Sequence, residues 1–428
     1  MVLVLLLVLT ILTLLIGIPV AFSLGISASA SVVVMGGVPL TLIPQKIYSG
    51  MDSFPLLCIP FFIFAGELMS RGKITEKLLD FALVLIGRIR GGLGLANVAA
   101  SMFFGGMTGS AIADASALGS VGIPMMIKSG YGKRFSAAIT CAAAMVGPII
   151  PPSIPVVIYA MAVGVSIGGL FLAGIIPGIL VGLALMVGVY IISIRRKYPI
   201  REEKITLPGF FSSLKAVSFA LVLPIIIVGG IVAGIFTPTE AAAAAVGYAF
   251  IVTVLIIRSV KMSQLPKMLI RSGVMTAIVM IIVGTSTIWG WVVAVEQFGD
   301  TLAYLLQSSS PITFLLLINI FFLLLGTVMD NIPVILIFAP TLAPIATSLG
   351  IHPLHFGMIV CLNTTLGLIT PPLGEVLFIA CPIAGVRLED LSKEIFGFFL
   401  IEVAILFLVT YVPFITLGIP NIFGFLGG

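Results

Sequence analysis

Apolar residues occupy long runs of this chain, and short polar segments separate the runs. Several runs approach the roughly 20 residues that a helix needs to cross a bilayer, beginning with MVLVLLLVLTILTLLIG at the N-terminus. No basic residue precedes this first run and no small-residue cleavage site follows it, so it predicts a retained span rather than a cleaved signal peptide. The pattern therefore predicts an all-α polytopic membrane protein in a lipid bilayer.

The charged residues are few and lie mostly between the apolar runs. Only 9% of the 428 residues are charged, and the net charge of +5 comes from basic loops, which mark the cytoplasmic side of a membrane protein rather than a nucleic-acid partner. The four cysteines lie in apolar segments away from the two histidines, so no disulfide or zinc pattern results. No phosphate-binding loop of the G-x-x-x-x-G-K-S/T type occurs, so we expect an ion gradient to supply energy.

The two halves of the chain resemble each other. A shift of 220 positions aligns CAAAMVGPIIPPSIPVVIYA (141–160) with CLNTTLGLITPPLGEVLFIA (361–380), with seven of twenty residues identical. Basic residues exchange ends between the copies, since Lys128 corresponds to Ser348 whereas Arg387 corresponds to Ile167. This exchange predicts inverted-topology repeats, as in many secondary transporters. Chance similarity of apolar segments is the alternative.

Repeats and basic loops together divide the chain. The predicted parts are N-terminal scaffold helices (1–87), a first repeat core (88–192), a basic cytoplasmic loop with central scaffold helices (193–300), a second repeat core (301–385) and a C-terminal helix (386–428).

Each repeat core begins with two apolar arms joined by a polar tip. The hairpins cover 91–127, with tip GGMTGS, and 312–347, with tip GTVMDNIP. Most arms reach roughly 21–26 Å as helices, which is less than the 30 Å hydrocarbon core. The arms therefore predict two re-entrant helical hairpins that enter from opposite sides. Full spans with tight loops are the alternative.

A longer apolar stretch follows each hairpin and is interrupted by prolines. The stretches 135–165 and 356–384 contain GPIIPPSIP and GLITPPLGE, in which the paired prolines supply no backbone N–H donor. We therefore expect two broken transmembrane helices, because unwound backbone at membrane depth is tolerated where it lines a cavity. Merely kinked scaffold helices are the alternative.

The tips and breaks carry the candidate chemistry. Freed carbonyls are hard oxygen ligands that suit a sodium ion, and half-helix N-termini present N–H groups to an anion. The sodium-binding candidates are Gly106, Thr108, Gly109, Ser110, Gly147, Ile150, Gly326, Asp330, Asn331, Gly367 and Thr370. The substrate-binding candidates are Thr108, Pro151, Pro152, Ser153, Thr327, Pro371, Pro372 and Glu375.

Three acidic residues near these segments have competing interpretations. Asp330 is the best candidate for a charged cation ligand, with a helix cap as the alternative. Asp114 suits a helix-dipole or packing role, and Glu375 either neighbours a helix N-cap or lines the site. No Lys or Arg falls within a tip or a break, so an acidic substrate would be held by backbone N–H groups, hydroxyls and bound sodium.

At this point the sequence resembles a known family. The segments GGMTGSAIADASALGSVGIPMM, VGPIIPPSIPVVIYA, FTPTEAAAAA, GTVMDNIPVILIFAPTLAPI and LGLITPPLGEVLFIA, in this order, are similar to the large membrane subunit of the tripartite ATP-independent periplasmic (TRAP) transporters. The resemblance covers essentially the whole chain. It implies an elevator-type, sodium-driven importer of organic acids in a bacterial inner membrane, with sialic acid favoured over C4-dicarboxylates by the wording of the motifs.

The resemblance also implies partners and ion sites. The partners are a small four-helix membrane subunit, here a separate polypeptide, and a soluble periplasmic substrate-binding protein. The implied sodium sites lie between the first tip (106–110) and the break at 147–152, and between the second tip (326–331) and the break at 367–372.

Three other functions remain open from the sequence. A stand-alone sodium-coupled anion transporter of related fold is the nearest, and a channel would have less need of paired broken helices. An intramembrane aspartyl protease would use Asp114 and Asp330 as a carboxylate pair, but no independent protease signature accompanies them, so we expect no catalytic residues and no enzymatic activity.

Overall fold

The computed structural model describes residues 1–71, 74–200, 207–298 and 310–426. Within these ranges the chain is helical and has no strand, which confirms the all-α prediction. Six described helices are long and apolar enough to cross a membrane: Phe54–Arg71, Ile167–Arg195, Pro238–Ile256, Met262–Val295, Asn331–Ser348 and Leu388–Tyr411. Between 33% and 61% of each span's most apolar window is buried inside the protein, so much of its surface is free to face lipid.

The N-terminal part consists of α1 (Val2–Leu15), α2 (Val20–Met35), α3 (Leu42–Met51), the short 3₁₀ turn η1 (Phe54–Leu57), α4 (Cys58–Arg71) and α5 (Ile74–Ile86). Of these helices, α2, α3 and α4 pack along the long helix α14 (Leu265–Val295). Hydrogen bonds join three of these helices, since Trp289 Nε1 donates to Thr10 Oγ1 at 3.1 Å and Thr10 Oγ1 donates to Ser27 Oγ at 2.8 Å. Such bonds hold apolar helices together where no hydrophobic effect distinguishes protein from lipid.

The first hairpin consists of α6 (Gly92–Thr108) and α7 (Ala111–Lys128). Gly109 ends α6 with a φ of +61°, a value that favours glycine, and Ser110 caps α7 by accepting a hydrogen bond from Ala113 N at 3.4 Å. The chain continues through α8 (Lys133–Ala144), α9 (Ile154–Val163) and α10 (Ile167–Arg195). The helix thus stops at Ala144 and resumes at Ile154, within the stretch where the prolines predict a break.

The central segment returns to the N-terminal helices. It contains α11 (Leu207–Pro224), the π-helical turn η2 (Ile225–Gly229), α12 (Gly230–Val232), α13 (Pro238–Phe250), the π-helical turn η3 (Ile251–Ile256), the 3₁₀ turn η4 (Met262–Gln264) and α14. Thr237 and Glu240 form a capping box that starts α13, where Pro238 occupies the first helical position. Helix α13 packs against α4.

The C-terminal part repeats the hairpin and the interrupted helix. Its helices are α16 (Pro311–Gly326), α17 (Asn331–Ser348), α18 (Pro353–Gly367), α19 (Glu375–Ala384), α20 (Leu388–Tyr411) and α21 (Phe414–Ile422). The helix is interrupted between Gly367 and Glu375, again at the predicted proline pair.

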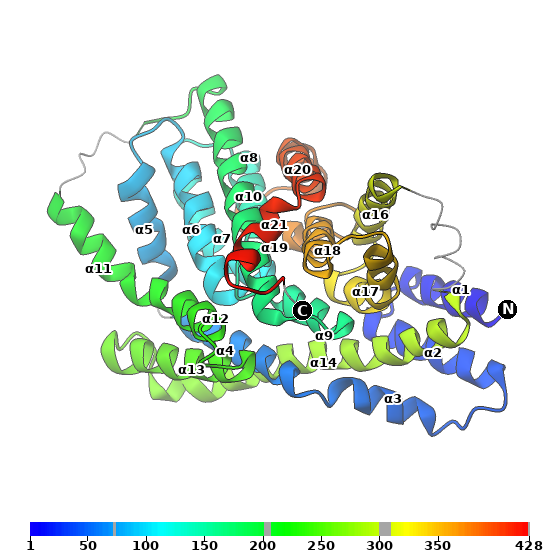
Figure 1. Ribbon diagram of the computed structural model, residues 1–428. Helices are drawn as coiled ribbons and strands as arrows, with labels where there is room; N and C mark the ends of the chain where they lie inside the picture. The colour runs from blue at the N-terminus through cyan, green and yellow to red at the C-terminus, as the bar shows by residue number, and fades with distance from the viewer. Residues whose placement is uncertain (72–73, 201–206, 299–309, 427–428) are drawn as a thin grey trace.

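The two repeat cores interlock. Helix α7 packs against α19 and α17 packs against α9, so each hairpin contacts the interrupted helix of the other half as well as its own. In the same way α8 packs against α20, and α18 against α10. Figure 1 shows these helices gathered side by side, with α14 crossing below them along α2 and α3. We call the helices α6–α10 and α16–α20 the core.

Basic residues meet at the end of the core where α8 and α20 begin and α10 ends. Arg134 Nη2 lies 3.1 Å from Asp390 Oδ1, and Arg196 Nη1 lies 2.6 Å from Glu394 Oε1. The hydrogen bond to Glu394 raises the pKa of Arg196 above its ordinary value. These pairs tie both halves together at the end that the basic loops assign to the cytoplasm.

Glycine pairs bring each hairpin against its own interrupted helix. A Cβ added at Gly105 would lie 2.5 Å from the Cα of Gly147, and one added at Gly326 would lie 2.8 Å from the Cα of Gly367. Real Cβ atoms do not approach backbone this closely, so glycine is required at Gly105, Gly326 and Gly367, whereas a Cβ at Gly147 would lie 3.5 Å from the Cα of Gly105. Main chain therefore packs directly on main chain at equivalent positions of the two halves.

Gly367→Ala should lower the stability of the folded protein. An added methyl group would meet the Cα of Gly326 at 2.5 Å, and such overpacking costs about 1–3 kcal/mol. The matched control is Gly397→Ala in α20, where a Cβ would meet nothing within 4 Å and alanine favours the helix. Thermal unfolding in detergent should show a lower midpoint for the first variant only; equal midpoints would contradict the close contact.

Candidate functional site

The first hairpin tip lies against the first break. A Cβ added at Gly109 would overlap the carbonyl oxygen of Pro152, and one added at Gly106 would lie 3.6 Å from that of Pro151. Ser153, which follows the paired prolines, is fixed locally. Its Oγ donates to the carbonyl of Pro148 and accepts from Val156 N at 3.3 Å, which caps α9. The Pro151–Pro152 peptide bond is cis.

The first break leaves main-chain oxygens free. Among the described residues, no N–H or O–H group donates to the carbonyls of Ile150, Pro151 or Pro152. Pro151 and Pro152 are buried, and an unpaired carbonyl buried away from water is costly. These oxygens are therefore available to coordinate a hard cation beside the hairpin tip.

The second hairpin tip lies against the second break in a similar way. Leu373 N donates to the carbonyl of Thr327 at 3.1 Å, while the hydroxyls of Thr327 and Thr370 donate to carbonyls in their own helices at 2.7 and 2.8 Å. The Pro371–Pro372 peptide bond is cis, and both prolines are exposed, unlike their counterparts in the first half. The two sites thus share backbone geometry but differ in their surroundings.

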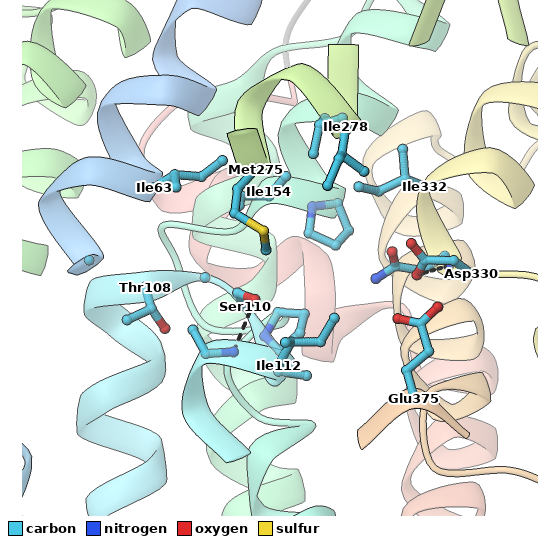
Figure 2. Close-up of a pocket in the computed structure, with 18 of the residues that line it drawn as sticks. Ile63, Thr108, Ser110, Ile112, Ile154, Met275, Ile278, Asp330, Ile332 and Glu375 are labelled. Carbon is cyan, nitrogen blue, oxygen red and sulfur yellow. Dashed lines mark hydrogen bonds between the residues drawn. The ribbon is translucent and has the colours of Figure 1, made fainter. Parts of the chain in front are cut away.

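A cavity of about 850 Å³ lies between the core and the helices α2, α4 and α14. The first turns of four core helices reach it: Ala111 to Ala113 of α7, Ile154 and Pro155 of α9, Asn331 to Pro333 of α17, and Glu375 of α19. Figure 2 shows side chains from these turns pointing into the cavity. Helix N-termini carry partial positive charge and unpaired N–H groups, so their convergence makes a site for an anion.

The predicted site residues divide into two groups. Those that line the cavity are Thr108, Gly109, Ser110, Asp330, Asn331 and Glu375. Those that lie outside its lining are Gly106, Gly147, Ile150, Pro151, Pro152, Ser153, Gly326, Thr327, Gly367, Thr370, Pro371 and Pro372, which form the contacts between tips and breaks behind it. The substrate candidates among the prolines are therefore not on the cavity wall in this conformation.

Asp330 and Glu375 begin two of the converging helices. Asp330 caps α17 by accepting a hydrogen bond from Asn331 N at 2.6 Å, which is the cap that we considered as the alternative to a cation ligand. Glu375 is the first residue of α19 and follows Gly374, whose φ is +43°. Both carboxyl groups lie at the edge of the cavity (Figure 2).

Sequence reasoning missed the residues that α4 and α14 contribute. Glu67, Arg71, Arg271 and Ser272 all line the cavity. Glu67 Oε1 lies 2.6 Å from Arg71 Nε and 3.6 Å from Arg271 Nη1, so one carboxylate pairs with both arginines. These residues lie at the ends of apolar runs, where charges indicate topology, and no local pattern places them next to the hairpin tips.

Two buried hydroxyls on the cavity wall have no hydrogen-bond partner among the described residues. They are Thr108 Oγ1, which belongs to the first tip, and Ser272 Oγ. A buried hydroxyl without a partner costs free energy, so both hydroxyls are available to donate to a ligand in the cavity.

Asp114 lies away from the cavity. It is fully buried in α7, where Ser101 Oγ donates to its Oδ1 at 3.2 Å, and it is not among the residues that line the cavity with Asp330. The two aspartates therefore do not face each other across one site, as a protease pair would. Among the described residues, no group of three or more His, Cys, Asp and Glu side chains could hold a metal ion.

A helical membrane protein in which interrupted helices and hairpin tips border a largely apolar cavity with a few polar groups belongs to the class of secondary transporters. The family model described as tripartite ATP-independent periplasmic transporter, DctM component, matches residues 7–415, and the chain belongs to this family.

Relatives that are named for different substrates are equally similar to this chain. The chain is 38% identical to a C4-dicarboxylate TRAP transporter large permease protein, DctM, of Pseudomonas aeruginosa over 94% of both chains. It is also 38% identical to the sialic acid TRAP transporter large permease protein SiaM of Vibrio cholerae, over 95% of this chain and 96% of that one. It is 38% identical to the isethionate TRAP transporter permease protein DctMQ of Oleidesulfovibrio alaskensis, of whose length it spans 63%.

Family membership establishes the general function. The chain is the large permease of a TRAP transporter, a multi-pass protein of the bacterial inner membrane that translocates an organic acid and is not an enzyme. The equal identities do not single out the sialic-acid branch that the motif wording favours.

Thr108→Val should separate a ligand role from a structural one. Because the Thr108 hydroxyl has no partner in the protein, its loss should leave the thermal midpoint unchanged or higher. Thr140→Val is the matched comparison, since Thr140 Oγ1 accepts from Asn97 Nδ2 at 3.0 Å between α8 and α6, and its loss should cost about 1–2 kcal/mol. A destabilised Thr108→Val variant would mean that the hydroxyl has a structural partner.

Proposed function

We propose that this chain forms the translocation pathway of a sodium-driven importer, with sodium at the contacts between hairpin tips and breaks and the organic acid in the adjoining cavity. The observation that carries the proposal is the convergence of the N-termini of α7, α9, α17 and α19 on one cavity backed by unpaired carbonyls. N–H groups suit an anion, and carbonyls suit a small hard cation.

Sodium binding is supported by the main chain of the first break. The free carbonyls of Ile150, Pro151 and Pro152 lie behind the tip residues Gly106 and Gly109. A cation there would compensate these oxygens and would stabilise the contact between tip and break. At the second contact, Asp330 adds a carboxylate beside the Thr327 tip, so its cap role and a role in cation binding are compatible.

Inverted repeats and an elevator movement fit the packing. The core interlocks through α7 with α19 and α9 with α17, whereas α1–α5 and α11–α14 surround it as the proposed scaffold. A tightly interlocked core would move as one body past such a scaffold and carry the ion and acid sites with it. The hairpins would then be re-entrant, entering from opposite sides.

The proposed partners are the two other components of a TRAP system. We propose a small membrane subunit and a periplasmic protein that captures the acid and delivers it, since these are the components that a TRAP system implies. Sialic acid remains the first candidate substrate. A stand-alone sodium-coupled carrier is the second candidate function, and uptake without added binding protein would support it.

The direct test is uptake by proteoliposomes that contain this chain and the small subunit. Loaded binding proteins for several organic acids would be supplied outside, and an inward sodium gradient would be imposed or omitted. We expect uptake of one acid that needs both the binding protein and the gradient. Uptake driven equally well without sodium would contradict the proposed coupling.

Asp330→Asn should impair coupling without unfolding the protein. Asparagine is also a good N-cap, so α17 should keep its start, while the loss of a charged oxygen should weaken sodium binding about tenfold or more. The measurement is the sodium concentration for half-maximal uptake, with Asp390→Asn at the remote ion pair with Arg134 as the matched control. An unchanged sodium dependence would remove Asp330 from the ion site.

A further inference from the structure

Two carboxyl groups face each other at one side of the cavity. Figure 2 shows the side chain of Glu375 pointing toward that of Asp330 at the same side of the cavity. Both side chains are only partly buried because they border the cavity. Two carboxylates at this separation repel each other unless a cation or hydrogen-bond donors lie between them.

The carboxylate oxygens of Asp330 and Glu375 are not all occupied by hydrogen bonds within the protein. One oxygen of Asp330 accepts from Asn331 N, but Glu375 makes no capping bond, and no described residue donates to its carboxylate. The basic residues described on the cavity wall, Arg71 and Arg271, already pair with Glu67 on the scaffold side. The N-termini of α17 and α19 therefore already carry carboxylates of the chain itself, so this side of the cavity is complementary to donors, and the N-termini of α7 and α9 remain for the acid group.

The repeat does not require this pair. Under the shift of 220 positions, Ser110 of the first half corresponds to Asp330 and Pro155 corresponds to Glu375. Ser110 and Pro155 line the same cavity, so the first half builds an equivalent wall without any carboxyl group. The carboxyl pair is thus a local addition to the wall and not part of what holds the two halves together.

The opposite side of the cavity presents hydrogen-bond donors instead of carboxylates. Thr108 and Ser110 lie across from Asp330 and Glu375 in Figure 2, near the N-terminus of α7 and the unpartnered Thr108 hydroxyl. An acid group fits this side, where helix N–H groups and hydroxyls donate. The cavity therefore distinguishes two ends of its ligand.

We propose that Glu375, which neighbours the proposed sodium ligand Asp330, selects an organic acid that also carries hydrogen-bond donors, either a protonated amine or hydroxyl groups, on the part remote from its acid group. This inference rests on the proposed function, since it assumes that the acid occupies the cavity. Acids without such donors leave the Glu375 carboxylate unpaired and are rejected, because a polar group of the site that loses its partner discriminates strongly between ligands.

The test measures ligand binding to the purified full chain by thermal shift at saturating sodium. The probes fall into three groups: amine-bearing acids such as 4-aminobutyrate, polyhydroxylated acids such as gluconate and sialic acid, and bare acids such as succinate and malonate. We expect a member of the first or second group to bind about tenfold or more tightly than any bare acid. Which of the two groups it belongs to identifies the donor.

Glu375→Gln should then raise the Kd of the preferred acid about tenfold and bring it closer to the Kd of the bare acids. The sodium concentration that gives the half-maximal thermal shift should stay unchanged. The matched control, Glu389→Gln, changes an exposed glutamate of α20 outside the cavity and should alter neither quantity.

Three results would overturn the inference. Tighter binding of bare acids by the wild type would do so, as would unchanged selectivity of Glu375→Gln. If Glu375→Gln shifts the sodium concentration for half-maximal effect or the pH dependence of binding, but leaves the selectivity between acids unchanged, Asp330 and Glu375 bind a cation or a proton instead. Binding of no acid from any group would contradict the proposed function itself.

Discussion

The direct contact between main chain and main chain at Gly105 and Gly147, and at Gly326 and Gly367, is the interaction on which the rest of the structure depends. In a hydrocarbon environment, unwound backbone persists only where protein or a ligand covers it. The glycine contacts bring a hairpin tip onto each break and supply that cover. Without them the proline pairs would expose bare carbonyls to lipid, and neither the breaks nor the cavity beside them could form.

Interlocking makes these two local contacts cooperative. Because α7 packs on α19 and α17 packs on α9, a change at one break is transmitted to the hairpin of the other half. A cation bound at one contact would therefore stiffen the wall that the second half presents to the cavity. Coupling between ion and acid binding then needs no direct contact between the two ligands, only a shared set of helices whose ends line both sites.

The sequence was sufficient for the parts of the site that depend on local backbone chemistry. Proline pairs stop a helix wherever they occur, and Gly109 with Ser110 ends one helix and starts the next, so the hairpins and interruptions could be placed within a few residues. Glu67, Arg71, Arg271 and Ser272 could not be found in this way, because their place in the cavity depends on how α4 and α14 cross the core. The prolines predicted to bind the substrate lie behind the wall in this conformation, and their role stays a prediction.

The division of charge between core and scaffold bears on how transport could proceed. The core contributes helix N-termini and the two carboxyl groups, whereas both arginines of the described cavity wall come from α4 and α14. If the core moves past the scaffold, the helix ends travel with the acid but the arginines stay behind. The acid would then be held by N–H groups and hydroxyls in every position and would lie near the Glu67–arginine cluster of the scaffold in only one. Its affinity would differ between the two sides of the membrane, which is what release requires.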